Sequence, residues 1–414
     1  MKRRVVITGL GVVSPIGNNI NEMWDSVTVG RNGIGLITNF DISNYNVKLG
    51  AEVKKLDLNQ YITPKEARKL DKFSQFAIVA AKQAYDDAQF NKIEDTVDKT
   101  RMGVIIGAGI GGLQTIEDNA IKLEAKGPDR VSPQFIPMSI VNLAAGNVAI
   151  SLGAKGMCSS AVTACSAGAD SIGLAYKEVA YGYHDVIFAG GSEASITPLG
   201  IAGFSVMKAT TTCTDPSRAS IPFDKDRSGF VMGEGAGVLV VEALDNAIKR
   251  GAKIYAEIIG YGATCDAHHI TAPSPGGEGA SRAMQIAIQS ANIDISNIEY
   301  INAHGTSTPL NDSTETTAVK NTFGDHAYKL SISSTKSMTG HLLGASGALE
   351  SIITIKALQQ DFLPPTINYK ERDENCDLDI VANIGRKRVL NYAMSNSFGF
   401  GGHNACLVFK KWAS

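Results

Sequence analysis

The chain has 414 residues, of which 44% are hydrophobic and 19% charged, and its formal net charge is −2. This is the composition of an ordinary globular protein, and it argues against disorder, a fibre, or attraction to nucleic acid or a membrane through overall charge. No apolar run approaches the length that a membrane-spanning helix needs. The six cysteines form no CxxC pair, so we expect no disulfide framework, no zinc site, and a location in the reducing cytoplasm.

Short apolar runs rich in Val and Ile alternate with longer stretches of helical periodicity along the chain. This alternation predicts an α/β protein with buried, largely parallel strands. The clearest helical patterns cover residues 71–89 and 278–292. The predicted strands are residues 4–8, 102–107, 186–190, 237–242, 254–261, 298–303, 330–333, 392–395 and 405–410.

Residues 63–72 combine a helix start with a concentration of positive charge. Thr63, Pro64 and Glu66 fit an N-cap, a first helical position and a capping box. A solvated helix face and a docking surface for an acidic partner are both consistent with the cations that follow. These cations are Lys65, Arg68, Lys69 and Lys72. Their spacing of i, i+3, i+4 and i+7 places side chains on one helix face.

The predicted strand at residues 102–107 leads into a glycine-rich segment, residues 107–112. The segment formally matches the GxGxxG pattern of dinucleotide-binding proteins. However, 42 glycines make chance matches common, and no clear strand that ends in an acidic residue follows at the expected distance. We therefore give this match little weight.

Cys165 lies where an apolar, strand-like segment turns into a predicted helix, followed by the small residues 166–169. At a helix N-terminus the free backbone N–H groups and the helix dipole stabilise a thiolate, which predicts a lowered thiol pKa. The same N–H groups can bind the oxyanion of an attacked carbonyl. The alternative is a small buried hydrophobic residue, so Cys165 needs partners before it counts as a nucleophile.

Candidate partners follow in the last third of the chain. His304 lies among Gly, Ser and Thr after a predicted strand, and Lys336 and His341 lie in a second segment of the same composition. Loops of this kind often carry chemistry, although a lone histidine is more often structural. A metal site is not expected at the histidines because carboxylate ligands at suitable spacing are missing.

The second half of the chain repeats features of the first half in the same order. Residues 5–11 correspond to residues 256–262, and the turn at Cys165 corresponds to the turn at residues 336–341. This predicts a duplicated fold with an N-terminal half, residues 1–250, and a C-terminal half, residues 251–414. Related loops from the two halves then meet around one site, which brings Cys165 close to both histidines and the lysine.

Taken together, these motifs resemble those of the β-ketoacyl-acyl carrier protein synthases of the type II kind, condensing enzymes of the thiolase superfamily. The resemblance covers essentially the whole chain, from residues 4–9 through Cys165, His304, Lys336 and His341 to residues 397–404. It implies a thiolase-like duplicated α/β fold with mostly parallel mixed sheets in α-β-α-β-α layers. It also implies a homodimer that condenses acyl- and malonyl-acyl carrier protein without a cofactor of its own.

The resemblance also implies a role for individual residues. Cys165 is the expected nucleophile, with the backbone N–H groups of Cys165 and Phe400 as the oxyanion hole and Phe400 as a gate. His304 and His341 are expected to bind the malonyl carbonyl, and Lys336 to tune the site through Glu350. The expected substrate contacts are Thr306, Thr308, Thr271, Ile110, Phe204 and, from the partner subunit, Phe135. The expected docking residues for the acidic carrier protein are Lys65, Arg68, Lys69, Arg130 and Lys208.

One departure from the pattern lies beside the nucleophile, where residues 166–170 read Ser-Ala-Gly-Ala-Asp and many relatives have Ala-Thr-Gly-Thr-Asn.

Three alternative functions remain open. A non-catalytic chain-length subunit is disfavoured because such subunits lack the nucleophile. A thiolase or an initiating synthase that uses coenzyme A thioesters is disfavoured by the two histidines and the lysine. A polyketide-type ketosynthase is not distinguished by these motifs.

Overall fold

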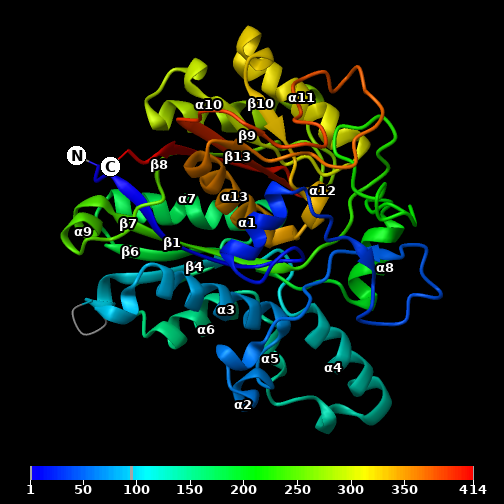
Figure 1. The fold of residues 1–414 in the computed structure, drawn as a ribbon. Helices are drawn as coiled ribbons and strands as arrows, with labels where there is room; N and C mark the ends of the chain where they lie inside the picture. Colours follow the sequence, from blue (N-terminus) through cyan, green and yellow to red (C-terminus); the bar gives the residue numbers. More distant parts are fainter. Residues whose placement is uncertain (1, 94–96, 414) are drawn as a thin grey trace.

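The computed structural model describes residues 2–93 and 97–413. Its centre is a ten-stranded mixed sheet with the order β10-β9-β13-β14-β8-β1-β7-β6-β4-β5. Helices lie above, between and below the two halves of this sheet, so that the molecule has α-β-α-β-α layers (Figure 1). The strands of the sheet are β1 (Val5–Val13), β4 (Met102–Gly107), β5 (Cys158–Ser159), β6 (Val186–Glu193), β7 (Gly235–Ala243), β8 (Ala256–Cys265), β9 (Tyr300–Asn302), β10 (Ser331–Ser333), β13 (Tyr392–Gly399) and β14 (His403–Lys411).

The strand order confirms the predicted duplication. Along the N-terminal half the order is β5-β4-β6-β7-β1, and along the C-terminal half it is β10-β9-β13-β14-β8, with the same sequence of parallel and antiparallel pairings. The two halves meet where β1 pairs with β8 over residues 5–7. The exact boundary between residues 250 and 251 stays a prediction.

Paired glycines set the distance between sheet and outer helices in each half. In β1, a Cβ at Gly11 would lie 1.8 Å from the carbonyl oxygen of Ala80 on α3 (Lys72–Asp87). In β8, a Cβ at Gly262 would lie 2.1 Å from the carbonyl oxygen of Ala283 on α10 (Glu278–Ala291). A strand glycine at such a place permits close approach of another backbone. The same packing device therefore occurs at corresponding positions of both halves.

The central layer consists of α7 (Ala167–Ala180) and α13 (Ser346–Gln360), which contact each other and strands of both halves. The predicted helices at residues 71–89 and 278–292 are confirmed as α3 and α10. The remaining helices are α1 (Ile20–Thr28), α2 (Pro64–Ala67), α4 (Leu113–Lys126), α5 (Phe135–Ser139), α6 (Leu143–Leu152), α8 (Pro198–Val206), α9 (Leu244–Lys249), α11 (Pro309–Phe323) and α12 (Lys336–Thr339). Two small sheets pair β2 (Gly35–Leu36) with β3 (Leu49–Gly50) and β11 (Phe362–Leu363) with β12 (Arg386–Lys387).

The pairing directions differ from the expectation of largely parallel strands. Parallel pairs are confined to β5-β4-β6 and β10-β9-β13, and the strands between these groups pair antiparallel. A physical reason is visible at β13 and β14, which are consecutive and joined by a short turn, a connection available to antiparallel neighbours but not to parallel ones. The expectation of a mixed α/β fold is confirmed.

The expected continuous cationic helix is wrong, although its capping box is confirmed. Thr63 accepts from the backbone N–H of Glu66, whose side chain accepts in return from the backbone N–H of Thr63. The helix α2 ends at Ala67, because Asp71 has extended backbone angles and caps a new helix, α3. Lys72 belongs to this second helix. In the described part of the chain, no helix is long and apolar enough to cross a membrane.

Candidate active site

A cavity of about 360 Å³ opens between the two halves of the fold and is lined by most of the predicted site residues. Its lining comes from the turn before α7, the loops after β9 and α12, the end of β13 and the loop between β8 and α10. Cysteine and histidine side chains therefore meet although they are far apart in sequence. The predicted residues in the lining are Cys165, Phe204, Lys208, Thr271, His304, Thr306, Thr308, His341 and Phe400.

Cys165 lies in the tight turn that leads into α7. The preceding Ala164 has φ 49°, a left-handed conformation that is uncommon for a residue with a side chain. The side chain of Cys165 is buried and receives a hydrogen bond from the backbone N–H of Phe400. Burial raises the pKa of the Cys165 thiol to about 12. The expected lowered pKa is therefore wrong, because loss of solvation outweighs the opposing effect of Lys336.

The loop that carries His304 is fixed by a buried carboxylate. Glu315 on α11 accepts hydrogen bonds from the backbone N–H groups of His304 and Gly305, at 2.9 and 2.8 Å. Nζ of Lys336 lies 3.4 Å from Nδ1 of His304. Because an ammonium group can only donate, Nδ1 is the acceptor and the hydrogen of the neutral ring is assigned to Nε2. Sequence reasoning missed Glu315, since nothing in an acidic residue of a helical pattern indicates which backbone groups it will meet.

His341 has the same tautomer for a different reason. Its Nδ1 accepts from the backbone N–H of Leu343 at 3.2 Å and lies 2.8 Å from Oγ of Ser346. Since a backbone N–H can only donate, the hydrogen of the neutral ring is again assigned to Nε2. The rings of His304 and His341 lie with centroids 5.2 Å apart at 84° to each other. Burial and the nearby Lys336 hold the pKa of both histidines well below its usual range.

Lys336 and Glu350 form a buried ion pair beneath the histidines, as the resemblance implies. Both side chains are almost inaccessible to solvent, and Nζ of Lys336 also donates to the carbonyl oxygen of His304 at 2.6 Å. Burial raises the pKa of Glu350 to about 7, against the opposing effect of the ammonium group. Lys336 thus connects the charge state of Glu350 with the loop of His304.

Hydroxyl and aromatic groups surround the reactive centre. Oγ1 of Thr306 and Oγ1 of Thr308 lie 2.8 Å apart in the cavity wall. The ring of Phe204 lies 6.2 Å from that of Phe400 and 5.4 Å from that of Phe230, between centroids. Phe230 in turn packs edge-on against His341. Sequence reasoning missed Phe230, because an isolated aromatic residue carries no signal that separates cavity wall from core.

Two predicted pocket residues lie outside this lining. Ile110 is half-buried in the apolar cluster that also contains Cys165 and Phe204. Phe135 begins α5 and does not line the cavity within this single chain. Its expected position in the pocket of a partner subunit stays a prediction.

The glycine-rich segment at residues 107–112 has a structural role that the sequence did not indicate. The carboxylate of the buried Glu193 accepts hydrogen bonds from the backbone N–H groups of Gly109, Ile110, Gly111 and Gly344. These N–H groups are the ones that would bind a pyrophosphate in a dinucleotide site. The glycine segment therefore contributes to the fold around Cys165 and does not offer a nucleotide site.

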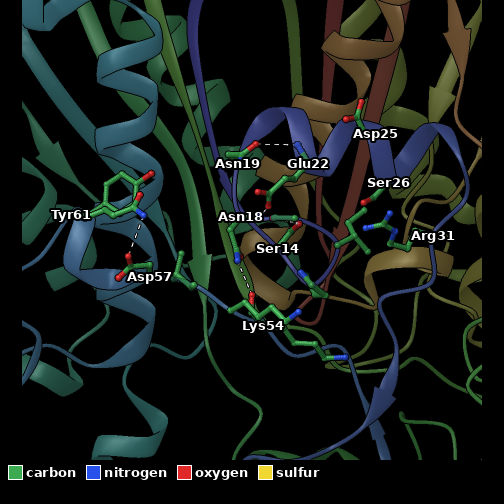
Figure 2. A pocket seen from close by; sticks show the side chains of 16 residues that line it. Ser14, Asn18, Asn19, Glu22, Asp25, Ser26, Arg31, Lys54, Asp57 and Tyr61 are labelled. Carbon is green, nitrogen blue, oxygen red and sulfur yellow. Dashed lines mark hydrogen bonds between the residues drawn. The ribbon is translucent and has the colours of Figure 1, made fainter.

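A second, more polar cavity of about 610 Å³ lies at the start of α1 (Figure 2). Asn18, Asn19 and Glu22 form its wall with Lys54 and Asp57, and the figure shows Asn18 bonded to the backbone of Lys54. None of the predicted site residues lines it. Among residues 2–93 and 97–413, no group of three or more His, Cys, Asp or Glu side chains is arranged to hold a metal ion.

Two family models match the chain. The model described as "Beta-ketoacyl synthase, N-terminal domain" matches residues 2–247, and "Beta-ketoacyl synthase, C-terminal domain" matches residues 255–370. The chain belongs to the β-ketoacyl synthase family. Relatives include the 3-oxoacyl-[acyl-carrier-protein] synthase 2 of Synechocystis, 51% identical, and that of Staphylococcus aureus, 53% identical, each with 99% of both chains covered. The family assignment makes the chain an acyltransferase.

Solved structures of β-ketoacyl synthases share the whole fold. One from Burkholderia phymatum matches with a TM-score of 0.93 and 35% identity over all of both chains. A type II polyketide ketosynthase, solved with its acyl-carrier protein and bound to the hexaketide, matches with a TM-score of 0.93 and 33% identity, also over all of both chains. The predicted thiolase-like class of fold is therefore confirmed.

The predicted docking residues of this β-ketoacyl synthase are all exposed but do not form one helix face. Lys65 lies on α2, with Arg68 and Lys69 directly after it. Lys208 follows α8 and lines the mouth of the cavity, whereas Arg130 follows α4. Lys72 is engaged elsewhere, since its Nζ lies 2.6 Å from Oε1 of the buried Glu234. It is therefore unsuited to the docking surface.

Proposed function

We propose that this β-ketoacyl synthase condenses an acyl-acyl carrier protein with malonyl-acyl carrier protein in type II fatty acid elongation, with Cys165 as the nucleophile. The products are 3-oxoacyl-acyl carrier protein, CO2 and free carrier protein. The observation that carries the proposal is the meeting of a buried thiol with two neutral histidines in one cavity. The high identity to relatives named 3-oxoacyl-[acyl-carrier-protein] synthase 2 supports the same reaction.

The first half-reaction transfers the acyl group to the enzyme. The sulfur of Cys165 bonds to the thioester carbon, the bond to the pantetheine sulfur breaks, and the proton of the Cys165 thiol goes to the departing pantetheine thiolate. The backbone N–H groups of Cys165 and Phe400 stabilise the oxyanion. With a thiol pKa of about 12, the proton leaves Cys165 as the new bond forms, and no resident thiolate is required.

The second half-reaction forms the carbon–carbon bond. The Nε2–H groups of His304 and His341 both donate to the carbonyl oxygen of the malonyl thioester. Loss of CO2 leaves its electron pair in an enolate, whose charge develops at that oxygen. The enolate carbon attacks the acyl-enzyme and displaces the sulfur of Cys165, which takes up a proton from solvent. Burial and Lys336 keep both rings neutral, and Lys336, paired with Glu350, also holds the tautomer of His304.

The carrier protein is proposed to dock on the exposed cations Lys65, Arg68 and Lys69, with Arg130 and Lys208 as further contacts. Its pantetheine arm then enters past Lys208 and meets the hydroxyl groups of Thr306, Thr308 and Thr271 in the cavity wall. No cofactor of the enzyme itself takes part, because the pantetheine group arrives on the carrier protein. The cytoplasm, where these carrier proteins and their substrates meet, is the proposed location.

A second copy of the chain is the proposed partner of the face formed by residues 113–162. The elements of this stretch, α4, α5, α6 and β5, contact one another in chain order, and its side chains Ile121, Ile136, Ile150 and Val162 are more than half exposed. Exposed apolar side chains gathered in this way are typical of a protein interface. Among the described residues, the strand β5 also ends the sheet with one edge unpaired, which offers backbone groups to a matching strand. In such a homodimer Phe135 would contribute to the pocket of its partner.

The test is intact-protein mass spectrometry after mixing the enzyme with a medium-chain acyl-acyl carrier protein. We expect one acyl group to be added to the natural chain and none to Cys165→Ala, and the adduct to be discharged by malonyl-acyl carrier protein. Absence of an adduct with every acyl length would contradict the proposal and favour a non-catalytic chain-length subunit. A CoA-dependent enzyme would instead be acylated only by coenzyme A thioesters.

A further inference from the structure

Asp170 is a buried carboxylate in the first turn of α7, five residues after the nucleophile, with 6% of its surface exposed. Its Oδ1 accepts a hydrogen bond from the hydroxyl of Tyr261 at 2.6 Å. Its Oδ2 accepts from the hydroxyl of Thr163 at 2.5 Å and lies 3.3 Å from Oγ of Ser166. In the part of the chain that the structure describes, no cation forms an ion pair with it. Hydroxyl groups alone therefore satisfy this charge.

Two of these hydroxyls flank Cys165 in sequence. The carbonyl oxygen of Thr163 accepts from the backbone N–H of Ser166 at 3.1 Å and from its hydroxyl at 2.8 Å, which closes the turn around Cys165. Ala164 lies inside this turn and has a left-handed backbone conformation, with φ 49°. Such a conformation persists only where the surroundings determine it strongly.

The turn also packs against the end of β13. A Cβ at Gly399 would lie 2.7 Å from the carbonyl oxygen of Thr163 and 3.1 Å from the backbone nitrogen of Cys165. Phe400, the next residue, donates its N–H to the Cys165 sulfur. The turn is thus fixed both by close packing against Gly399 and by hydrogen bonding to the carboxylate of Asp170.

We propose that Asp170 is a positioning residue that sets the direction of the Cys165 sulfur relative to the N–H of Phe400. It acts through the hydroxyls of Thr163 and Ser166, and the bond from Tyr261 ties this arrangement to β8 in the other half of the fold. The inference rests on the proposed function of Cys165 and goes beyond it. A carboxylate accepts at both oxygens, from Tyr261 at one and from Thr163 at the other, whereas an asparagine at this position would accept at only one of them.

The test substitutes Asp170→Asn and follows three rates. The first is alkylation of Cys165 by iodoacetamide, which needs no substrate. The second is acyl-enzyme formation from acyl-acyl carrier protein, and the third is decarboxylation of malonyl-acyl carrier protein, which depends on the histidines. We expect the first two to fall by about tenfold to a hundredfold, since a small misplacement of a reacting group has effects of this size. Decarboxylation should change by less than twofold, and Thr163→Val should give the same pattern.

A matched control is Asp71→Asn, which changes another buried carboxylate that accepts from a threonine hydroxyl. Asp71 bonds to Thr115 at 2.6 Å and caps α3, away from the cavity. This control should lower the melting temperature and leave all three rates per folded molecule unchanged. If Asp170→Asn changes all three rates equally, or none, the positioning role is wrong. If the natural chain forms no acyl-enzyme but its alkylation still responds to Asp170→Asn, the proposed function fails and the positioning role stands.

Discussion

The charge state of His304 and His341 decides what the cavity can do, because only a neutral ring presents Nε2–H to a carbonyl oxygen without a competing positive charge. Burial and Lys336 lower the pKa of both rings well below the usual range, so both stay neutral as the pH falls through the range where a free histidine gains a proton. Glu350, whose pKa is about 7, titrates in this range, so the test uses Glu350→Gln, in which we expect the rate of malonyl-acyl carrier protein decarboxylation to be constant between about pH 8 and pH 6. A pH–rate profile that falls with a midpoint near the ordinary histidine pKa would show that the rings are not held neutral.

The ion pair of Lys336 and Glu350 makes a second prediction at the scale of single residues. Lys336→Met keeps the volume of the side chain but leaves a buried carboxylate without its cation. We expect the free energy of unfolding to fall by about 3–5 kcal/mol at pH 8, because the buried Glu350 carboxylate must then either stay charged without a cation or take up a proton. Urea unfolding measures this change. Adding Glu350→Gln to the same chain should recover part of the loss. A double variant no more stable than Lys336→Met would show that the two residues are not energetically coupled.

At the scale of elements, the contact between α7 and α13 depends on glycine. A Cβ at Gly347 would lie 2.8 Å from the backbone nitrogen of Ala169 and 2.7 Å from Oγ of Ser397. Gly347→Ala should therefore force the helices apart and lower the free energy of unfolding by about 1–3 kcal/mol. The matched control is Gly203→Ala in α8, where no atom of the described residues lies within 4 Å of the added Cβ. Chemical unfolding of both variants is the measurement, and equal stabilities would exclude the steric explanation.

How far the sequence predicts an element depends on whether its signal is local. The strand β4 matches its predicted bounds, Met102–Gly107, because an apolar run between turn signals defines it alone. By contrast β1 was expected to end at Thr8 and continues to Val13. The glycines that suggested its end are present because α3 packs directly on the strand, a tertiary contact that no local pattern reveals.

The same distinction applies to the candidate site. Cys165 and the two histidines could be named from sequence because each stands in an unusual local setting, and the structure brings them into one cavity. The buried carboxylates of Glu193, Glu315 and Asp170 could not, because their role depends on which N–H and hydroxyl groups fold around them. The raised pKa of the Cys165 thiol was missed for the same reason, since desolvation depends on the complete surroundings of the sulfur.

At the scale of the whole molecule, the duplicated topology explains why one cavity contains groups from both halves. The turns that follow the corresponding strands β5 and β10 both reach the cavity, so the Cys165 turn and the turn at residues 336–341 meet there. The cavity is therefore closed by the packing of the two halves. Exposed residues of its lining, Met207 and Lys208 after α8 and Leu310 on α11, mark where it opens to solvent.

The proposed docking surface gives the prediction at this scale. Reversing Lys65, Arg68 and Lys69 to Glu should raise the KM for carrier-bound substrates by about tenfold or more, because attraction to an acidic partner becomes repulsion. The same variant should use free pantetheine thioesters normally, since these residues do not line the cavity. The control reverses the exposed Lys249 and Lys329, of which Lys249 lies on α9, at the opposite end of the molecule from α8 (Figure 1). The measurement is steady-state kinetics with both forms of substrate. An equal loss of activity on carrier-bound and free substrates would mean that the cations on and after α2 are not the docking surface. Equal effects of the two charge reversals would mean the same.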